Sequence, residues 1–266
     1  MKEKIKILTG WSNAGGSTVS FINLCNLLND RGYDCTLYGP HAWHIGKCKS
    51  GWLNECPLNE KNERLIVHFL KIPARPIESE AVVLACHERP HWFNIKETEC
   101  FWDETVFVSE GQKKDQGTEG IIIPNVVTGL SPSKIVVLGK PAGIIGSIDE
   151  HKNTHTSIER AVKDGHKEIL LYGLVTEQDY YEKHVKSYVE EGTVTIKGHE
   201  DDKQKMYDSI SCAYQSSKGE TFNLIKAECK LTETPYHGLP SAESGADHSW
   251  TKSEILNAWK TALNLS

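Results

Sequence analysis

Two glutamates stand eight positions apart near the C-terminal end of the chain, at Glu220 and Glu228. If a helix covers Thr221–Leu231, eight residues make just over two turns, so both carboxylates lie on about the same face. Such carboxylates accept hydrogen bonds from sugar and ribose hydroxyls. Amides of the first turn can bind a phosphate oxygen, here those of Phe222, Asn223 and Leu224. The simpler alternative is two solvated acids on an amphipathic helix, the usual state of glutamates.

A glycine-containing turn near the N-terminus is a second candidate site. It follows the short β-branched run Lys4–Thr9 and includes Gly15 and Gly16, just before a helical pattern from Ser17. Backbone N–H groups at such a helix start stabilise an anionic phosphate. The segment Gly10–Ser17 nearly matches the P-loop pattern, but Gly16 stands where the P-loop lysine belongs. The alternative is that the glycines only let a strand turn tightly into its helix.

The elements around this turn form a βαβ unit in fewer than 40 residues. The helical pattern ends at Arg31-Gly32, and Tyr33–Leu37 indicates the next strand. Residues 41–62 show no clear period and are expected to form an irregular loop. Buried strands are expected further along the first half, at Arg64–Leu70, Ala81–Cys86, Thr105–Ser109 and Gly120–Ile123.

A second series of alternating elements follows Pro132. Expected strands are Ala142–Ile148, Glu168–Tyr172, Thr193–Lys197 and Ser211–Gln215. Expected helices are Thr154–Lys163, Thr176–Val189, Asp201–Ser209 and Thr221–Leu231. Two successive α/β domains joined near residues 131–140 are the simplest account of this pattern.

Composition narrows the function further. The chain has 266 residues, with 30 Lys and Arg against 36 Asp and Glu, a net charge of −6. This acidic balance without a basic cluster argues against nucleic acid as a partner. No apolar run reaches the roughly 20 residues of a membrane helix, and the N-terminus lacks a signal-peptide pattern, so a cytoplasmic location is expected. The eight cysteines form no CxxC pair and are expected to be free thiols rather than metal ligands.

With these elements in place, the chain resembles the retaining GT-B glycosyltransferases, whose motif is two glutamates separated by seven residues. Landmarks of that motif are matched by Glu220, Phe222, Leu224, Ala227 and Glu228. Segments before the motif are similar too, at Ile145–Ile148 with Lys152-Asn153, Lys197–His199, Met206–Asp208 and Ser211–Ala213. The first half contains further segments similar to those of the family, in the same order along the chain: Gly15-Gly16, Arg31–Tyr33, Val108-Ser109 and Ile123–Asn125.

The resemblance implies an α/β fold of the GT-B type, with two facing Rossmann-like domains built on parallel sheets. Residues 1–135 would form the acceptor-side domain and residues 136–248 the domain that binds the nucleotide sugar. Residues 249–266 would form a helix that crosses back to the N-terminal domain. The implied activity is metal-independent, retaining transfer of a sugar, expected to be a hexose, from a nucleotide-diphosphate sugar to a glycan, lipid or small-molecule acceptor. Peripheral contact with a membrane is compatible with such acceptors.

The resemblance also assigns roles to individual residues. Lys152 would neutralise the donor diphosphate, Glu220 would contact the donor sugar, and Glu228 would hold the ribose of the nucleotide. Thr221 would contact the donor together with the segment Phe222–Leu224. His87, at the end of the strand Ala81–Cys86, would face the sugar. No metal ligand and no cofactor besides the donor substrate are expected. Simpler alternatives are a solvated loop lysine at 152 and an ordinary loop histidine at 87.

Two other functions compete with this one. A degenerate P-loop ATPase of the chromosome-partitioning type would continue a single sheet from the first half into the second. A non-catalytic glycosyltransferase-like binding protein would keep the fold and bind a glycan or a partner.

The C-terminal segment carries a clear helix signal. Thr251 and Glu254 have the spacing of a capping box. An apolar stripe follows, at Ile255, Leu256, Trp259, Ala262 and Leu263. We expect Trp259 to pack on the first domain.

Overall fold

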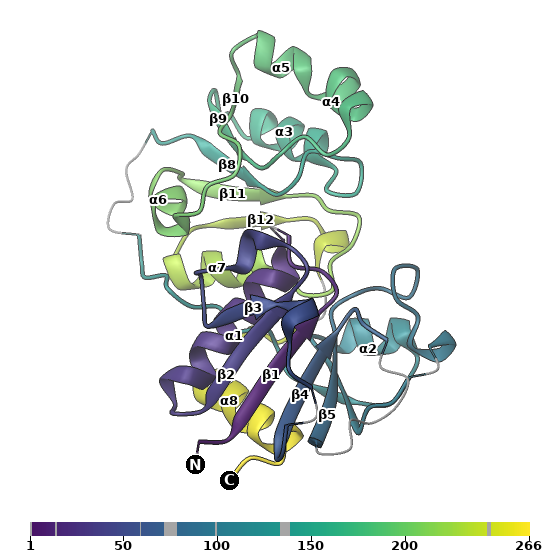
Figure 1. The fold of residues 1–266 in the computed structure, drawn as a ribbon. Coiled ribbons are helices and arrows are strands. Elements are labelled where there is room, and N and C mark those ends of the chain that lie inside the picture. Colours follow the sequence, from purple (N-terminus) through teal and green to yellow (C-terminus); the bar gives the residue numbers. More distant parts are fainter. Residues whose placement is uncertain are drawn as a thin grey trace. The chain divides into compact units, whose positions relative to one another are not determined.

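The structure is a computed structural model that describes residues 2–13, 15–58, 60–71, 79–98, 100–133, 139–243 and 246–266. The chain divides into two compact units (Figure 1). The first combines Met1–Val126 with Gly245–Ser266, and the second is Val127–Ser244. The domain boundary expected at 135/136 lies within residues 134–138, outside the described residues.

A parallel sheet forms the centre of the first unit. Its strand order, in the described part of the chain, is β3-β2-β1-β4-β5-β6-β7, and every neighbouring pair is parallel. The strands are β1 (Lys4–Thr9), β2 (Asp34–Gly39), β3 (Ser50–Trp52), β4 (Glu63–His68), β5 (Ser79–Cys86), β6 (Glu104–Phe107) and β7 (Ile121–Ile122). All six residues of β4 and seven of eight in β5 are buried, as expected for strands covered on both faces.

Helix α1 (Gly16–Asp30) covers the sheet with a stripe of apolar side chains. Phe21, Leu24 and Leu28 lie in the same buried cluster as Ile5 and Ile7 of β1. The chain then leaves the helix through Gly32, whose φ of +93° is the left-handed conformation that favours glycine.

The final helix, α8 (Lys252–Ala262), is part of the first unit. The expected capping box is confirmed, since Thr251 and Glu254 bond to each other's backbone N–H groups. Ile255, Leu256 and Trp259 lie in the cluster that contains Ile5 and Phe21. The segment is also fixed beyond its last turn, where Arg64 of β4 donates to the carbonyls of Leu263 (2.8 Å) and Asn264 (3.1 Å).

Residues 41–62 are more ordered than their sequence indicated. The prediction of an irregular loop was wrong at β3, which pairs with Leu37–Gly39 of β2. Short 3-10 helices, Ala42–His44 and Leu53–Glu55, lie on either side of β3. Buried His44 holds the segment through contacts to the carbonyls of His41 (2.6 Å) and Gly51 (3.0 Å). Three-residue strands defined by such tertiary contacts leave no periodic signal. Helix α2 (Glu110–Gln116) and the 3-10 turn Ile95–Glu97 were not predicted from the sequence.

The second unit has its own parallel sheet, with the order β10-β9-β8-β11-β12. Its strands are β8 (Ala142–Ile145), β9 (Ile169–Tyr172), β10 (Val194–Ile196), β11 (Cys212–Gln215) and β12 (Tyr236–Gly238). Its helices are α3 (Thr154–Lys163), α4 (Gln178–His184), α5 (Lys186–Glu190), α6 (Lys203–Asp208) and α7 (Leu224–Thr232), with a 3-10 turn at Pro240–Ala242. Two separate sheets contradict the single continuous sheet required by the P-loop ATPase alternative.

The helix expected at Thr176–Val189 is two helices, α4 and α5. The interruption falls at Val185, whose φ of −119° departs from helical values. Its side chain is fully buried in the core with Ile144 and Tyr180. Packing of this β-branched residue therefore overrides the helical pattern around it.

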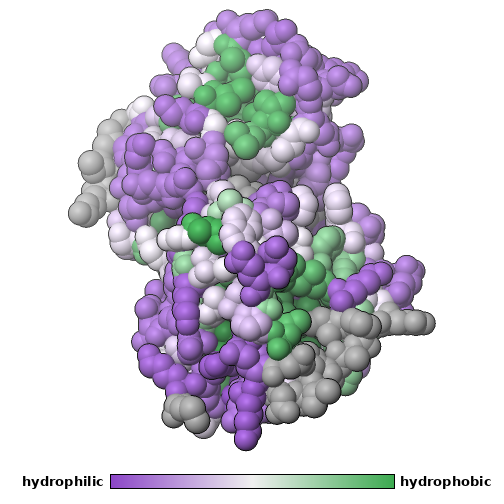
Figure 2. All heavy atoms as spheres, viewed as in Figure 1, coloured by the Kyte–Doolittle hydropathy of each residue, from purple (hydrophilic) through white to green (hydrophobic). Residues whose placement is uncertain are grey.

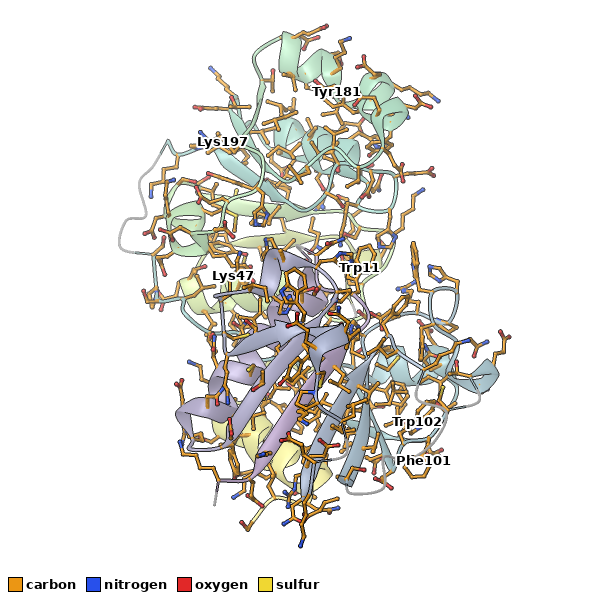
Figure 3. All side chains as sticks on the ribbon, in the orientation of Figure 1. Trp11, Lys47, Phe101, Trp102, Tyr181 and Lys197 are labelled. Atoms are coloured by element: carbon orange, nitrogen blue, oxygen red, sulfur yellow. The ribbon has the colours of Figure 1, made fainter. Side chains whose placement is uncertain are left out.

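Hydrophilic residues predominate on the face of both units shown in Figure 2, with smaller hydrophobic areas among them. Scattered apolar surface of this kind is normal for globular proteins. In the first unit Phe101 and Trp102 lie together (Figure 3), packed on the cluster of Leu8, Leu65 and Val82. Among the described residues there is no helix that meets the length and hydropathy needed to span a membrane.

Replacing Trp259 by alanine should lower the free energy of unfolding by about 3–5 kcal/mol, because it leaves a cavity in the core under α8. Urea denaturation followed by circular dichroism measures the change. Trp92→Ala is the matched control, since Trp92 is 71% exposed and its loss should cost less than about 0.5 kcal/mol. Equal stability of the two variants would contradict the core position of Trp259.

Candidate functional site

Each sheet has a point at which the strand order reverses direction. In the first unit the chain adds strands outward from β1 to β3 and then returns to place β4 on the other side of β1. In the second unit β8, β9 and β10 run outward in one direction, and β11 then pairs with the free side of β8. In open α/β sheets, ligands bind outside the carboxyl ends of the strands at such points.

The second unit places Lys152 and Glu220 together at its reversal point. Lys152 follows β8, and Glu220 follows the neighbouring strand β11. Lys152 Nζ lies 2.7 Å from Glu220 Oε1, and Gln215 Nε2 donates to the same oxygen at 3.0 Å. The carboxylate is 14% exposed and the lysine 28%, so the pair is accessible from solvent but well shielded. Two predicted site residues that are 68 positions apart thus form one ion pair.

The turn that carries Lys152 is held by Asp149. Its carboxylate accepts the backbone N–H of Lys152 (2.7 Å) and the hydroxyl of Thr176 (2.9 Å). Burial would raise the pKa of Asp149, but hydrogen bonds from Ser147, from the Lys152 backbone and from Thr176 outweigh it and lower the pKa. Asp149 therefore stays ionised and fixes the direction in which Lys152 leaves the turn.

Glu228 is a buried carboxylate on α7, 3% exposed. It accepts a hydrogen bond from the hydroxyl of Tyr207 (2.8 Å) and forms an ion pair with Lys203. Burial, together with the charge of Glu228, raises the pKa of Tyr207 well above its ordinary value, so this hydroxyl remains a donor. Lys203 and Tyr207 both come from α6, which the sequence analysis did not connect with the site.

The expected geometry of the two glutamates was wrong in one respect. Helix α7 begins at Leu224, so Glu220 lies before the helix and the argument of a shared face does not apply. Asn223 caps the helix by accepting the N–H of Lys226 (2.9 Å). Phe222 and Asn223 consequently precede the first turn, and of the expected amide donors Leu224 alone is in it. Asparagine is a strong N-cap residue, so the sequence did contain the signal for this start.

A chain of hydrogen bonds connects this cap to Glu220. Asn223 Nδ2 donates to the hydroxyl of Tyr236 (2.7 Å), which donates to Gln215 Oε1 (2.9 Å). Gln215 in turn donates to Glu220. Thr221, which was expected to contact the donor, lies half-buried between Glu220 and the cap. The position of Glu220 therefore depends on β12 and on the start of α7.

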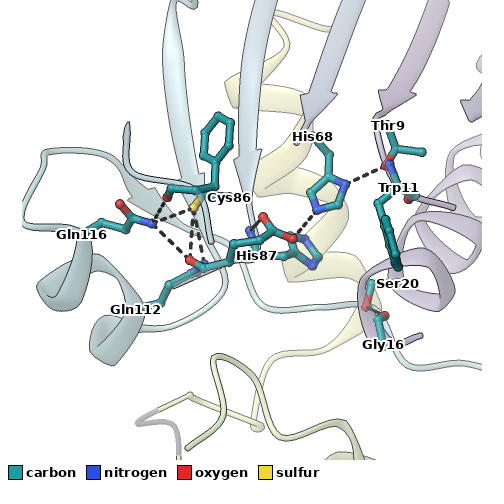
Figure 4. Close-up of polar contacts among 11 residues, drawn as sticks. Thr9, Trp11, Gly16, Ser20, His68, Cys86, His87, Gln112 and Gln116 are labelled. Atoms are coloured by element: carbon teal, nitrogen blue, oxygen red, sulfur yellow. Dashed lines mark hydrogen bonds and ion pairs between the residues drawn. The ribbon is translucent and has the colours of Figure 1, made fainter. Parts of the chain in front are cut away.

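The reversal point of the first unit carries a second polar cluster. Thr9 and His68 are register partners at the ends of β1 and β4, and Thr9 Oγ1 lies 2.7 Å from His68 Nδ1. The other ring nitrogen of His68 lies 2.6 Å from Glu88 Oε1 (Figure 4). Gln112 and Gln116 of α2 donate to the Glu88 carbonyl, each at 3.1 Å. Burial would raise the pKa of Glu88, but His68 outweighs it and lowers the pKa.

His87 lies beside this cluster, after the last residue of β5. Its ring is 4.6 Å from Phe21 and 5.4 Å from His68, measured between ring centroids. Burial and the neighbouring His68 lower the pKa of His87 to about 3, so the imidazole is neutral at physiological pH. His87 also lines a small pocket of about 10 Å³ with Ser20, Phe21 and Trp259.

Gly15 and Gly16 form the start of α1 at this same edge. Gly15 is the extended N-cap residue and Gly16 the first helical residue, and no side chain among the described residues caps the helix. The turn after β1 also carries Trp11, 47% exposed (Figure 3). The predicted residues His87, Gly15 and Gly16 are thus all at the carboxyl edge of the first sheet. His68, Thr9 and Glu88 were missed because nothing in their spacing relates them.

Solved structures that this chain resembles in fold include several glycosyltransferases. TarM matches with a TM-score of 0.75 and 12% identity, over 99% of each chain. AviGT4, a glycosyltransferase involved in avilamycin A biosynthesis, matches with a TM-score of 0.67 and 15% identity, over 96% of this chain and 87% of that one. HepE of Anabaena, solved with UDP-glucose, matches with a TM-score of 0.67 and 14% identity, over 91% and 81%.

No family model matches the sequence, and no curated protein matches it at a significant level. The structural similarities establish the fold class predicted from the sequence, which is α/β of the GT-B type with a parallel sheet in each unit. Within the described residues there is no cluster of three or more His, Cys, Asp or Glu side chains arranged to hold a metal ion.

Replacing His87 by glutamine should make the melting temperature less sensitive to pH between about 6.5 and 5. The folded protein keeps this imidazole neutral down to about pH 3, whereas the unfolded chain takes up a proton near pH 6.5. The unfolded state therefore binds more protons in this window, so stability falls as the pH falls. Calorimetry at pH 7, 6 and 5 measures the slope. His91→Gln, at an exposed histidine, should keep the wild-type slope; a His87 variant that does so would contradict the neutral state of His87.

Proposed function

We propose that this chain is a retaining glycosyltransferase that moves a hexose from a nucleotide-diphosphate sugar to a carbohydrate or lipid-linked acceptor. The observation that carries the proposal is the Lys152–Glu220 pair at the reversal point of the second sheet. A cation and a carboxylate at this place match the two chemical parts of a sugar nucleotide, its diphosphate and its hydroxyls.

Donor binding would break the Lys152–Glu220 ion pair and give each residue a new partner in the ligand. The diphosphate takes the ammonium of Lys152, and hydroxyls of the donor sugar take the carboxylate of Glu220. Glu228 would accept hydrogen bonds from the ribose hydroxyls in place of Lys203, while Tyr207 keeps the carboxylate in position. The backbone N–H of Leu224, at the start of α7, would donate a hydrogen bond to a phosphate oxygen.

The residues of the first unit fit the same substrate chemistry. Backbone amides at the start of α1, at Gly15 and Gly16, suit an anionic group. A neutral His87 can donate one hydrogen bond and accept another, which suits a sugar hydroxyl.

The transfer itself needs little covalent participation by the protein. In the proposed front-face route the bond between the anomeric carbon and the diphosphate breaks, and the acceptor oxygen bonds to that carbon on the same face. The proton of the acceptor hydroxyl goes to the departing diphosphate oxygen. Lys152 stabilises the charge that grows on the leaving group, so positioning and electrostatics supply the catalysis without a metal ion.

Ligands of similar structures support a uridine nucleotide and a hexose as first candidates. HepE was solved with UDP-glucose and also with UDP and glucose. A TarM variant of S. aureus was solved with UDP and α-GlcNAc-glycerol. These ligands belong to those proteins, and they determine which compounds to test first.

A panel of UDP-, GDP- and ADP-sugars tests the proposal directly. At least one should raise the melting temperature, because a ligand that binds the folded state stabilises it, and should be hydrolysed slowly in the absence of an acceptor. Activity should be equal with EDTA and with Mg²⁺. Binding without hydrolysis or transfer to any acceptor would favour the non-catalytic alternative. Failure of every sugar nucleotide to bind would refute the proposal, and inhibition by EDTA that Mg²⁺ reverses would refute metal independence.

Glutamine substitutions should separate the roles of the two glutamates. Glu228→Gln should weaken nucleotide binding, and Glu220→Gln should mainly lower kcat, each by about tenfold to a hundredfold, as for a lost hydrogen bond to a charged group. Isothermal titration with the nucleoside diphosphate and steady-state kinetics measure the two effects. Glu190→Gln, at an exposed glutamate of α5, is the control. Unchanged affinity and kcat in both site variants would remove both assignments.

A further inference from the structure

A second lysine lies in the loop that carries Glu220. Lys218 is two residues before Glu220, and its side chain is 52% exposed. Its Nζ lies 2.5 Å from Glu150 Oε1, in the turn that carries Lys152. Its backbone N–H donates to the carbonyl of His151 at 2.9 Å.

These contacts join the two loops in a definite register. Glu150 pairs with Lys218, the carbonyl of His151 bonds to Lys218, and Lys152 pairs with Glu220. Both loops leave the carboxyl ends of adjacent strands, β8 and β11. The backbone of Lys218 is thus hydrogen-bonded to the residue directly before Lys152, and both ammonium groups branch from one small region.

The two ion pairs differ in how firmly they hold their lysine. Glu220 is largely shielded and has a second donor in Gln215, whereas Glu150 is 68% exposed. An exposed pair contributes little to stability because water solvates both charges almost as well. Lys218 can therefore leave Glu150 at low cost, and water then solvates the free carboxylate.

A bound diphosphate carries more negative charge than Lys152 alone can balance. A diphosphate bridged between a nucleoside and a sugar carries two negative charges, and a third develops when the sugar departs. Lys152 supplies one positive charge and already faces the negative charge of Glu220. A second cation is needed to approach neutrality, and Lys218 is on the adjoining backbone.

We propose that Lys218 is a second diphosphate-binding cation, paired with Glu150 in the free protein and transferred to the diphosphate when the nucleotide binds. This inference rests on the proposed function of the Lys152–Glu220 site. It adds that the site binds nucleoside diphosphates more tightly than monophosphates and nucleosides, by a larger factor than contact with Lys152 alone would produce.

Lys218→Gln should weaken UDP binding by about tenfold while leaving uridine binding unchanged, because the lost contact is to phosphate. Titration calorimetry with uridine, UMP and UDP measures the three affinities; GDP or ADP with its nucleoside and monophosphate replaces this series if the panel shows tighter binding. Lys186→Gln removes a comparably exposed lysine, paired with Glu182 at 2.7 Å on α4, and should change none of them. Melting temperatures of both variants check that the fold is kept.

Glu150→Gln distinguishes the cation from the loop contact. It breaks the same ion pair but leaves Lys218 free, so UDP should bind as tightly as to the wild type or more tightly. A loss of UDP affinity in Glu150→Gln equal to that in Lys218→Gln would overturn the proposal, since the pairing of the loops would then be what matters. Wild-type UDP affinity in Lys218→Gln would overturn it as well, with the proposed function intact. Absence of any nucleotide binding by the wild type would refute the proposed function and this inference together.

Discussion

Parallel strand pairing is the constraint on which the rest of this structure depends. In a parallel sheet covered on both faces the central strands are shielded from solvent, as β4 and β5 almost wholly are, and charged side chains within them, such as Glu63 and Arg64, are paired inside the protein. Chemistry is therefore confined to the loops that leave the carboxyl ends. Each reversal of strand order then places two such loops next to each other, β1 beside β4 and β8 beside β11.

Some ion pairs of this fold are buried and structural, whereas others are partly exposed and can be broken by a ligand. Lys6, 4% exposed, is enclosed by Glu60 and Glu63; burial would lower its pKa, but the hydrogen bonds that it donates to these carboxylates raise the pKa. Removing one partner of such a pair leaves an unmatched charge in the core, so it acts as a fixed structural element. Lys152 and Lys203 have partially exposed side chains and bind carboxylates that are more buried than they are. These lysines can exchange partners, which is what binding of an anionic ligand requires.

The two units prepare their polar groups in different ways. In the second unit the two glutamates are held in place by ion pairs, Glu220 with Lys152 and Glu228 with Lys203. In the first unit His68 lies between Thr9 and Glu88, and burial, together with the neighbouring His68, keeps the imidazole of His87 neutral where it packs against Phe21. Preorganised groups of this kind lose little conformational freedom on binding, so more of the interaction energy is available for recognition.

The sequence by itself determined most of the local structure. A short β-branched run located β1, helical patterns located α1 and α3, and the spacing of Thr251 and Glu254 located the start of α8. These features depend on residues within one or two turns of each other. The glutamate motif likewise singled out Glu220 and Glu228. The start of α7 at Leu224 was missed although Asn223 is a strong N-cap residue, and in the structure this cap is also held by Tyr236 and Ala242.

Tertiary structure alone decided which distant residues meet. Lys152 reaches Glu220, and Thr9 reaches His68, because of the order and register of parallel strands. Strand order is set by how whole helices and sheets bury their apolar faces, and no local spacing encodes it. The same holds for Tyr207 and Lys203 on Glu228 and for Lys218 beside Lys152. Elements could be derived from neighbouring residues, whereas the site is a product of packing between segments far apart in the chain.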